Sequence, residues 1–302
     1  MRERRDAPQS PEADQFSPLM ERMVTSVKGM NIESLRTAEA MADKNAFKIT
    51  VTDREAWNDP ENSEQLRQFL GQTTWEAFSQ REGGPDYDPA DAEQRDETLD
   101  IITTGDLSES DEIFVAADGE RVVGYITTSR VELPDDKKGC VLGLSAVNKE
   151  FRSKGIGREL YDRLFAEGNY DAILGCSATP AAIKTRLALG KKNGYETYFC
   201  GFKDGNYGDR GSAEEQERIK MLTEKTREPY IHSDVTIPPD QMQQDFIILR
   251  EGEGLPPITR ADVDLSRLDK GLAETFDKHL LPTQEKMPKD TVYGVLISQK
   301  KD

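Results

Sequence analysis

The stretch NKEFRSKGIGREL (residues 148–160) joins an apolar run to a helical pattern through a turn with two glycines. A strand, a Gly-rich turn and a helix form an anion site, because the first helical amides lack intrahelical partners and point at the turn. The helix dipole adds partial positive charge there. Gly155 and Gly157 lack Cβ atoms, so a diphosphate can approach the backbone closely. Cationic charge around the same concavity comes from Arg152, Lys154 and Arg158. The stretch therefore predicts a site for a pyrophosphate-bearing cofactor.

Two common phosphate-binding patterns do not fit this turn. The Walker pattern G-x-x-x-x-G-K-[ST] is absent, and the dinucleotide fingerprint G-x-G-x-x-G would have Leu160 at its third glycine. A lone G-x-G would be read as an ordinary strand–helix turn. Here the frame is R-x-x-G-x-G, preceded by LSAVNKEF and followed by RELYDRL.

The longer stretch VLGLSAVNKEFRSKGIGRELYDRLF (residues 141–165) resembles the acetyl-CoA motif of the GNAT N-acetyltransferase superfamily. That pattern is a strand ending in Val, a few polar residues, R/Q-x-x-G-x-G/A and a helix with leucines. It is matched here by Val147, Arg152, Gly155, Gly157 and Leu160. The resemblance implies an α/β (α+β) fold with a mixed central sheet that splays like a V between flanking helices. It also implies acetyl-CoA as the co-substrate.

The resemblance assigns roles to residues of the site. The wedge between the strand ending at Val147 and the strand at 172–177 would take the pantetheine arm, with Ala146 and Val147 offering backbone groups. The Arg158 side chain would help to hold the pyrophosphate. The backbone amides that would cradle it belong to Arg152, Ser153, Lys154, Gly155, Ile156 and Gly157. The implied chemistry is direct attack of an amine on the thioester, with a base removing the amine proton and a backbone amide polarising the carbonyl.

One family feature is missing. Members often carry N-x-x-A-x-x-x-Y-x-x-x-G-F, in which the Tyr protonates the departing thiolate. The aligned segment IKTRLALGKKNGY (residues 183–195) has Ile183 at the Asn position and Gly190 at the Tyr position. Three explanations stay open. The thiolate leaves unprotonated, since a thiol with a pKa of about 8.5 is a tolerable leaving group; the domain binds acyl-CoA without turnover; or another residue serves, from Tyr195, Tyr198 and Cys176.

A general base is expected on the strands that face the wedge or on an acidic insertion. The candidates are Glu132, at the end of a strand, and an acid from residues 86–112. Taken alone, Glu132 reads more readily as a solvated turn residue. Ser145 and Ser177 are polar positions in apolar strands, and Ser177 can equally be a buried serine bonded to the backbone.

The charge of the chain limits the partners that it can bind. The chain of 302 residues has 57 acidic and 40 basic residues and a net charge of −17, so its overall field would repel nucleic acid. Residues 82–112 hold 12 of the acids and one basic residue, Arg95. This segment is either a solvated loop or an acidic wall that attracts a cationic substrate. A cationic acceptor would be a polyamine, a basic amino acid, an aminoglycoside or a lysine-bearing peptide.

Pattern and composition divide the chain into three parts. The acetyltransferase-like domain is expected at 46–251, with insertions at 82–112 and 203–244. An N-terminal extension, partly disordered, would cover 1–45, and a C-terminal extension 252–302. The last strand of the chain, at 291–298, would pair with a sheet edge of its own chain or of a partner. The other strands are expected at 47–52, 113–117, 122–128, 140–147, 172–177, 195–202 and 245–251, and the Asp118-Gly119 turn predicts a hairpin between the second and third of these. Apolar residues at helical spacing predict a helix within 61–78, and a further helix is expected to start with Thr179 as N-cap and Pro180 as its first residue.

The remaining composition favours a cytoplasmic protein. No run of 18 apolar residues could span a membrane, and the N-terminus lacks the apolar core of a secretory signal. Three cysteines and two histidines have no metal-ligand spacing, so no metal site is expected. The flanks could also build a homodimer interface.

The sequence therefore predicts an acetyl-CoA-dependent N-acyltransferase, or N-acetyltransferase, acting on a primary amine. One alternative is a catalytically silent acyl-CoA-binding regulatory module, which the missing Tyr motivates. Another is an interaction protein whose flanks, 1–45 and 255–302, are the functional part.

Overall fold

The computed structural model describes the parts of the chain that carry the sheet and most of its helices. The described residues are 47–53, 69–74, 110–118, 121–177, 179–227, 246–250, 263–286 and 291–301. The expectations for the N-terminal extension and for most of the acidic insertion lie outside these residues.

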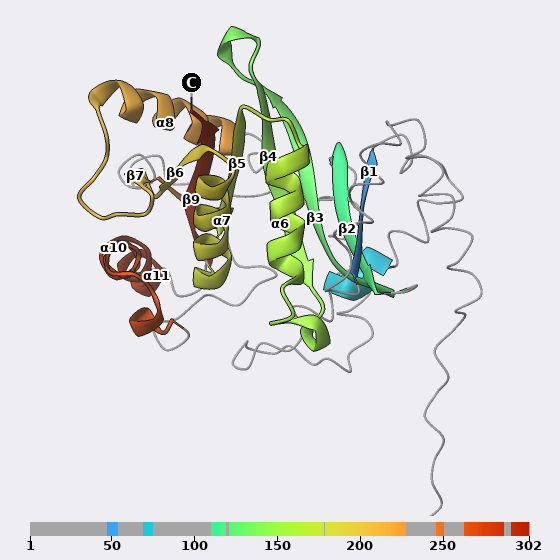
Figure 1. Ribbon diagram of the computed structural model, residues 1–302. Helices are drawn as coiled ribbons and strands as arrows, with labels where there is room; N and C mark the ends of the chain where they lie inside the picture. Colours follow the sequence, from blue (N-terminus) through green and yellow to red (C-terminus); the bar gives the residue numbers. More distant parts are fainter. Residues whose placement is uncertain are drawn as a thin grey trace, which may run out of the picture.

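A nine-stranded sheet forms the centre of the molecule, in the order β1-β2-β3-β4-β5-β9-β6-β7, with β8 paired to β9 (Figure 1). β4 and β5 pair in parallel and the other neighbours pair antiparallel, so the sheet is mixed, as predicted. The strands are β1 Phe47–Asp53, β2 Glu112–Asp118, β3 Arg121–Glu132, β4 Lys138–Val147, β5 Ala172–Ser177, β6 Tyr195–Phe199, β7 Phe202–Lys203, β8 Ile247–Arg250 and β9 Thr291–Lys300.

Helices cover both faces of the sheet. Alternate residues of a strand point to opposite faces, and Ile173 packs with α6 whereas Ala172 and Leu174 pack with α8. α6 and α7 lie side by side on the first face (Figure 1). Residues 69–74 are also helical, as predicted. The helices are α6 Ile156–Glu167, α7 Pro180–Lys192, α8 Ala213–Arg227, α10 Lys270–Thr275, a π-helical turn Phe276–Leu280 and α11 Leu281–Lys286.

Local signals set most of these boundaries. The strands β2 and β3 form the predicted hairpin, closed by the pair Asp118↔Arg121 around the Asp-Gly turn. Thr179 is the N-cap of α7 and Pro180 its first residue, as predicted, although no side-chain bond caps the helix there. Gly194 follows α7 at a φ of 81°, in the left-handed region that suits glycine.

The C-terminal strand β9 is a central strand and not an edge strand. It pairs with β5 along one side and with β6 along the other. The segment expected as an extension beyond residue 251 therefore supplies a strand to the middle of the sheet, and the boundary expected there does not hold. The strand 245–251, expected to end the domain, is the short β8, which pairs with the first residues of β9.

Strands β6 and β8 occupy one edge of β9, with an excursion of the chain between them. The amide of Cys200 donates to the Val295 carbonyl at 3.0 Å, and the Val295 amide donates to the Phe246 carbonyl at 2.9 Å. The chain leaves this edge at Cys200 and returns at Phe246, and both residues have positive φ (50° and 54°). A single strand was predicted for 195–202, but it breaks at Cys200 and Gly201 because the chain turns out of the sheet there.

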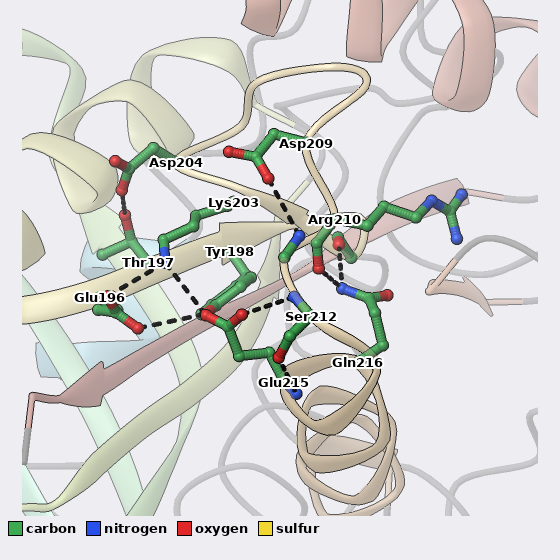
Figure 2. A network of polar contacts seen from close by, with 12 residues as sticks. Glu196, Thr197, Tyr198, Lys203, Asp204, Asp209, Arg210, Ser212, Glu215 and Gln216 are labelled. Carbon is green, nitrogen blue, oxygen red and sulfur yellow. Dashed lines mark hydrogen bonds and ion pairs between the residues drawn. The ribbon is translucent and has the colours of Figure 1, made fainter.

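A polar network ties α8 to β6 and β7 (Figure 2). The Tyr198 hydroxyl donates to Glu215 Oε1 at 3.1 Å, and Lys203 Nζ lies 3.1 Å from the same oxygen and 3.2 Å from Glu196 Oε1. The Ser212 amide donates to Glu215 Oε2 at 2.6 Å while Ser212 Oγ accepts from the Glu215 amide, which is a capping box. The hydrogen bond from the Ser212 amide and, after it, the one from Lys203 lower the pKa of Glu215 to about 2.

Replacing Glu215 by Gln is expected to make the stability of the protein less sensitive to acid. The folded pKa of about 2 lies below the ordinary 4.5, so the contribution of the charged carboxylate is complete above 4.5 and is lost as the pH falls toward 2. Thermal unfolding at neutral and acidic pH should therefore show a smaller loss in Glu215→Gln than in the wild type. Glu214→Gln, in the same exposed first turn, is the control and should behave as the wild type. Equal acid losses in all three proteins would contradict this role for Glu215.

Candidate functional site

A wedge opens between β4 and β5. The two strands pair only through Gly139↔Ala172, Cys140↔Ile173 and Val141↔Leu174. β4 then continues to Val147 and β5 to Ser177 without further pairing between them. This divergence is the V-shaped splay that the resemblance implies.

A β-bulge in β4 lies beside the closed end of this wedge. Thr128 pairs with Leu142 and Ile126 with Ser145, so two residues of β4 oppose Thr127 alone. Thr127 Oγ1 accepts from the amide of Leu144 at 2.8 Å and so satisfies the amide that the bulge displaces. Such a bulge bends its strand, which fits the point where β4 leaves β5.

The direction of the backbone groups in β4 follows from its pairing with β3. The Asn148 amide donates to the Val123 carbonyl at 2.9 Å. Hydrogen-bonded and non-hydrogen-bonded pairs alternate along an antiparallel ladder. The backbone groups of Ala146 therefore face β3, whereas those of Val147 and Ser145 face away from it, toward the wedge. Of the two residues expected to offer backbone groups to a pantetheine arm, Val147 has the fitting direction.

The turn after β4 is anchored by Phe151. Asn148 Oδ1 accepts from the Glu150 amide at 3.0 Å and caps the short 3-10 turn Lys149–Phe151. The Phe151 ring is buried and meets the Phe47 ring edge-on, with 6.2 Å between centroids. The polar half of the turn is thereby held at the surface, next to the end of β4.

The cations of the turn stay exposed. Arg152, Lys154 and Arg158 are all exposed side chains. Lys154 Nζ lies over the Phe151 ring, 4.3 Å from its centroid, and Arg152 Nε donates to the Val147 carbonyl at 3.4 Å. Two of the three cations are therefore held close to the turn, where they can meet an anion.

The N-terminus of α6 is open. Gly155 is its N-cap, with a φ of 88°, and a Cβ built there would meet no atom within 4 Å. The first helical bond runs from the Glu159 amide to the Gly155 carbonyl, so the amides of residues 156–158 precede the helical ladder. No side-chain bond caps this end in the described part of the chain. The geometry can receive an anion at the backbone.

Glu132, predicted as a general base, lies outside the wedge. It pairs with Lys138 at the start of β4, three residues before Val141, where the wedge closes. At a rise of about 3.3 Å per residue, this pair lies about 10 Å beyond the closed end, on the side away from the diverging strands. The exposed Glu132 therefore lies in the turn region of the β3–β4 hairpin. The prediction that it is the general base is wrong, because β4 and β5 diverge in the other direction.

Tyr195, predicted as a general acid, is a core residue. Its hydroxyl donates to the Tyr170 carbonyl at 2.8 Å, and its ring meets Phe165 edge-on at 5.2 Å. Burial raises the pKa of Tyr195 to about 12. It opens β6 opposite Lys300, at the closed end of the wedge, so the prediction for it does not hold either.

The other polar candidates have structural partners. Tyr198 is engaged in the network with α8, and Cys176 packs in the cluster that contains α8. Ser177 Oγ accepts from the Thr179 amide at 3.2 Å, in keeping with the backbone-bonding interpretation. Ser145 on β4 does reach a neighbour across the site, because its Oγ lies 3.0 Å from the Tyr161 hydroxyl of α6.

Gly190 stands where the family often has its Tyr, and the packing excludes any side chain there. A Cβ at Gly190 would lie 2.4 Å from Thr197 Cγ2 and 3.2 Å from Ser298 Oγ. Helix α7 thus rests directly on β6 and β9. A tyrosine could not occupy this position without moving the helix.

Sequence reasoning missed Arg186. It is 1% exposed, on the face of α7 that also buries Ile183 and Leu189. Its guanidinium lies beside Gly175 and over the Tyr161 ring. The sequence did contain a sign of this position. Arg186 lies three residues after Ile183 and three before Leu189, and this spacing places its charge on the inner face of the helix.

Two further properties concern the described residues alone. Among them, no helix has the length and apolar character needed to cross a membrane. The same residues contain no group of three or more His, Cys, Asp or Glu side chains that could hold a metal ion.

Comparison with known proteins gives one family match. Residues 69–178 match the model of the acetyltransferase (GNAT) family, which covers the turn, the wedge strand β4 and all of β5. No curated protein sequence matches the chain.

Several similar solved structures carry the name of an acetyltransferase. A GNAT family acetyltransferase from Brucella melitensis, in complex with acetyl-CoA, is 17% identical, with 49% of this chain and 83% of that chain covered and a TM-score of 0.32. A diaminobutyrate acetyltransferase from Paenibacillus lautus, in complex with L-2,4-diaminobutyric acid and coenzyme A, is 14% identical (51% and 82% covered, TM-score 0.30). An aminoglycoside acetyltransferase from an uncultured soil metagenomic sample, in complex with sisomicin, is 16% identical (51% and 90% covered, TM-score 0.30).

Proposed function

Because residues 69–178 of this chain belong to the GNAT family of acetyltransferases, we propose that the protein transfers the acetyl group of acetyl-CoA to a primary amine. The observation that carries the proposal is the turn at the mouth of the wedge. At this turn the N-terminus of α6 has no side-chain cap among the described residues, the glycine at its N-cap has open space around it, and the nearby cations are exposed. Free helical amides, room at the backbone and positive charge are the properties that favour binding of a diphosphate.

In this proposal acetyl-CoA lies along β4. The amides of residues 153–158 hold the diphosphate, because the Arg152 amide, which was also predicted to do so, donates to the Lys149 carbonyl at 3.2 Å. The side chains of Arg152, Lys154 and Arg158 neutralise its charge. The pantetheine arm enters the wedge and meets the backbone groups of Val147 and Ser145, which face away from β3. The thioester then lies toward the closed end of the wedge, near Leu142.

The reaction is a direct transfer. The amine nitrogen forms a bond to the acetyl carbon, the carbon–sulfur bond breaks, and the sulfur keeps the electron pair. The amine proton passes to a base or to water. Acids from residues 86–112 stay the predicted base, and they lie almost wholly outside the described residues.

A cationic acceptor is the proposed substrate class. The net charge of −17 and the 12 acids of residues 82–112 would raise the local concentration of a polyamine or a basic amino acid. Diaminobutyric acid and sisomicin, which two of the similar proteins bind, belong in the panel of acceptors. A cytoplasmic location and a homodimer remain predictions from the sequence.

The packing at Gly190 favours one alternative function. Without the Tyr that often protonates the thiolate, the domain would bind acyl-CoA and respond to it without turnover. The two functions predict the same cofactor site and differ only in the release of thiol.

The test is an acceptor panel with acetyl-CoA, in which free thiol and acetylated product are measured together. Release of thiol that depends on the amine, with product of the acetylated mass, would support the transferase. Binding of acetyl-CoA without release on any amine would support the silent module. Absence of both binding and release would overturn both functions.

A further inference from the structure

Arg186 places a fixed positive charge inside the molecule, at the apex of the wedge. Among the fully buried side chains of the described residues it has the largest volume. A Cβ built on Gly175 would lie 3.2 and 3.3 Å from its two terminal nitrogens and 3.0 Å from the Cβ of Leu142. Leu142 and Gly175 are the first residues of β4 and β5 beyond their last pair, Val141↔Leu174. The guanidinium therefore sits where the two strands part.

The space for this guanidinium comes from the two neighbouring elements. Gly175 has no side chain, so β5 leaves room that any larger residue would fill. On the other side the Tyr161 ring lies 5.9 Å from the guanidinium carbon, and its hydroxyl contacts Ser145 of β4. The charge is thus held between α7, α6 and the two strands that form the wedge.

The buried guanidinium of Arg186 influences the ionisation of a neighbouring thiol. A guanidinium stays protonated in proteins, and its field is strong where water is excluded. Burial raises the pKa of the nearby Cys140 thiol well above its ordinary value, and Arg186 opposes this shift. The same guanidinium would act on a thiol that lies at the apex of the wedge, beside Gly175 and Leu142.

We propose that the Arg186 guanidinium stabilises the coenzyme A thiolate as it leaves, in place of the tyrosine that Gly190 excludes. The inference rests on the proposed function. When the amine nitrogen bonds to the acetyl carbon and the carbon–sulfur bond breaks, the electron pair stays on sulfur as a thiolate beside the guanidinium. The amine proton goes to the base or to water. The thiolate takes a proton from water after it leaves the site, so no protein acid is needed.

The test measures the ionisation of coenzyme A bound to the chain of 302 residues, through the ultraviolet absorbance of the thiolate as a function of pH. In the wild type the bound thiol should ionise well below its ordinary pKa of about 8.5. In Arg186→Met it should ionise at or above that value, and in Arg186→Lys, which keeps a charge, in between. Arg163→Met, whose side chain pairs with Glu167 on α6, is the control and should match the wild type.

Kinetics provide a second readout. Arg186→Met should lower kcat roughly a hundredfold, as loss of a charge-stabilising group does, while the KM for acetyl-CoA changes little. If this variant does not fold, Gly175→Ala gives an independent route, because its methyl would displace the guanidinium. It should raise the pKa of the bound thiol in the same direction.

The outcomes separate the inference from the proposed function. If the wild type does not bind coenzyme A, both the role of Arg186 and the proposed function are overturned. Normal binding and transfer, with the same thiol ionisation in the wild type, Arg186→Met and Gly175→Ala, would overturn the role of Arg186 alone.

Discussion

A chain that ends at residue 290 is expected not to fold, because it loses the strand that joins the two halves of the sheet. β9 pairs with β5 on one side and with β6 and β8 on the other. Full burial of an aliphatic side chain stabilises a protein by about 1.5–3 kcal/mol. The four such side chains of β9 together contribute on the order of 6–12 kcal/mol, comparable to the whole stability of a domain. They are Val292, Val295, Leu296 and Ile297.

Circular dichroism and thermal unfolding measure this effect. The shortened chain should lack a cooperative transition, whereas a control chain ending at residue 300 should unfold as the wild type does. A cooperative transition in the chain that ends at residue 290 would show that the C-terminal segment is dispensable. That result would mean that the C-terminal segment is an extension outside the folded domain.

Replacing Gly155 by Glu is expected to abolish the stabilisation of the protein by acetyl-CoA. The side chain would enter the open space at the N-terminus of α6 and bring a negative charge to the place proposed for the diphosphate. A ligand at 100 times its Kd stabilises the folded protein by about 2.7 kcal/mol when it binds only that state. The wild type should show this gain, and Gly155→Glu should show none.

Gly194→Glu is the matched control. Gly194 also has a positive φ (81° against 88°) and open space around a built Cβ, but it follows the C-terminal end of α7. Both variants therefore carry similar backbone strain and the same added charge. Thermal unfolding with and without acetyl-CoA should show a shift in Gly194→Glu of the same size as in the wild type. Loss of the shift in both variants, or in neither, would contradict the assignment of the turn.

The elements that the sequence predicted well are those set by local chemistry. The Asp-Gly turn and the apolar runs beside it specify the β2–β3 hairpin. The R-x-x-G-x-G frame, with an apolar strand before it, specifies the turn and the start of α6. Each of these depends on residues that are neighbours in the chain.

The features that could not be predicted depend on distant pairing. The place of β9 between β5 and β6 is set by partners more than ninety residues away in sequence, and its pattern alone fits an edge or a centre. Glu132 and Tyr195 were predicted from their places in the sequence, yet the direction of the wedge and the burial of the ring decide their roles. The place of the Arg186 guanidinium depends on Gly175 of β5, which is its neighbour in the fold and not in the local sequence.

Hydrogen exchange of the backbone amides, with and without acetyl-CoA, tests most directly whether the cofactor occupies the turn and the wedge. On binding, exchange should become slower in residues 152–158 and at the end of β4, with little change in the β2–β3 hairpin or in α8. If acetyl-CoA binds but exchange in residues 152–158 is unchanged, or is slowed only elsewhere, the cofactor does not occupy the turn.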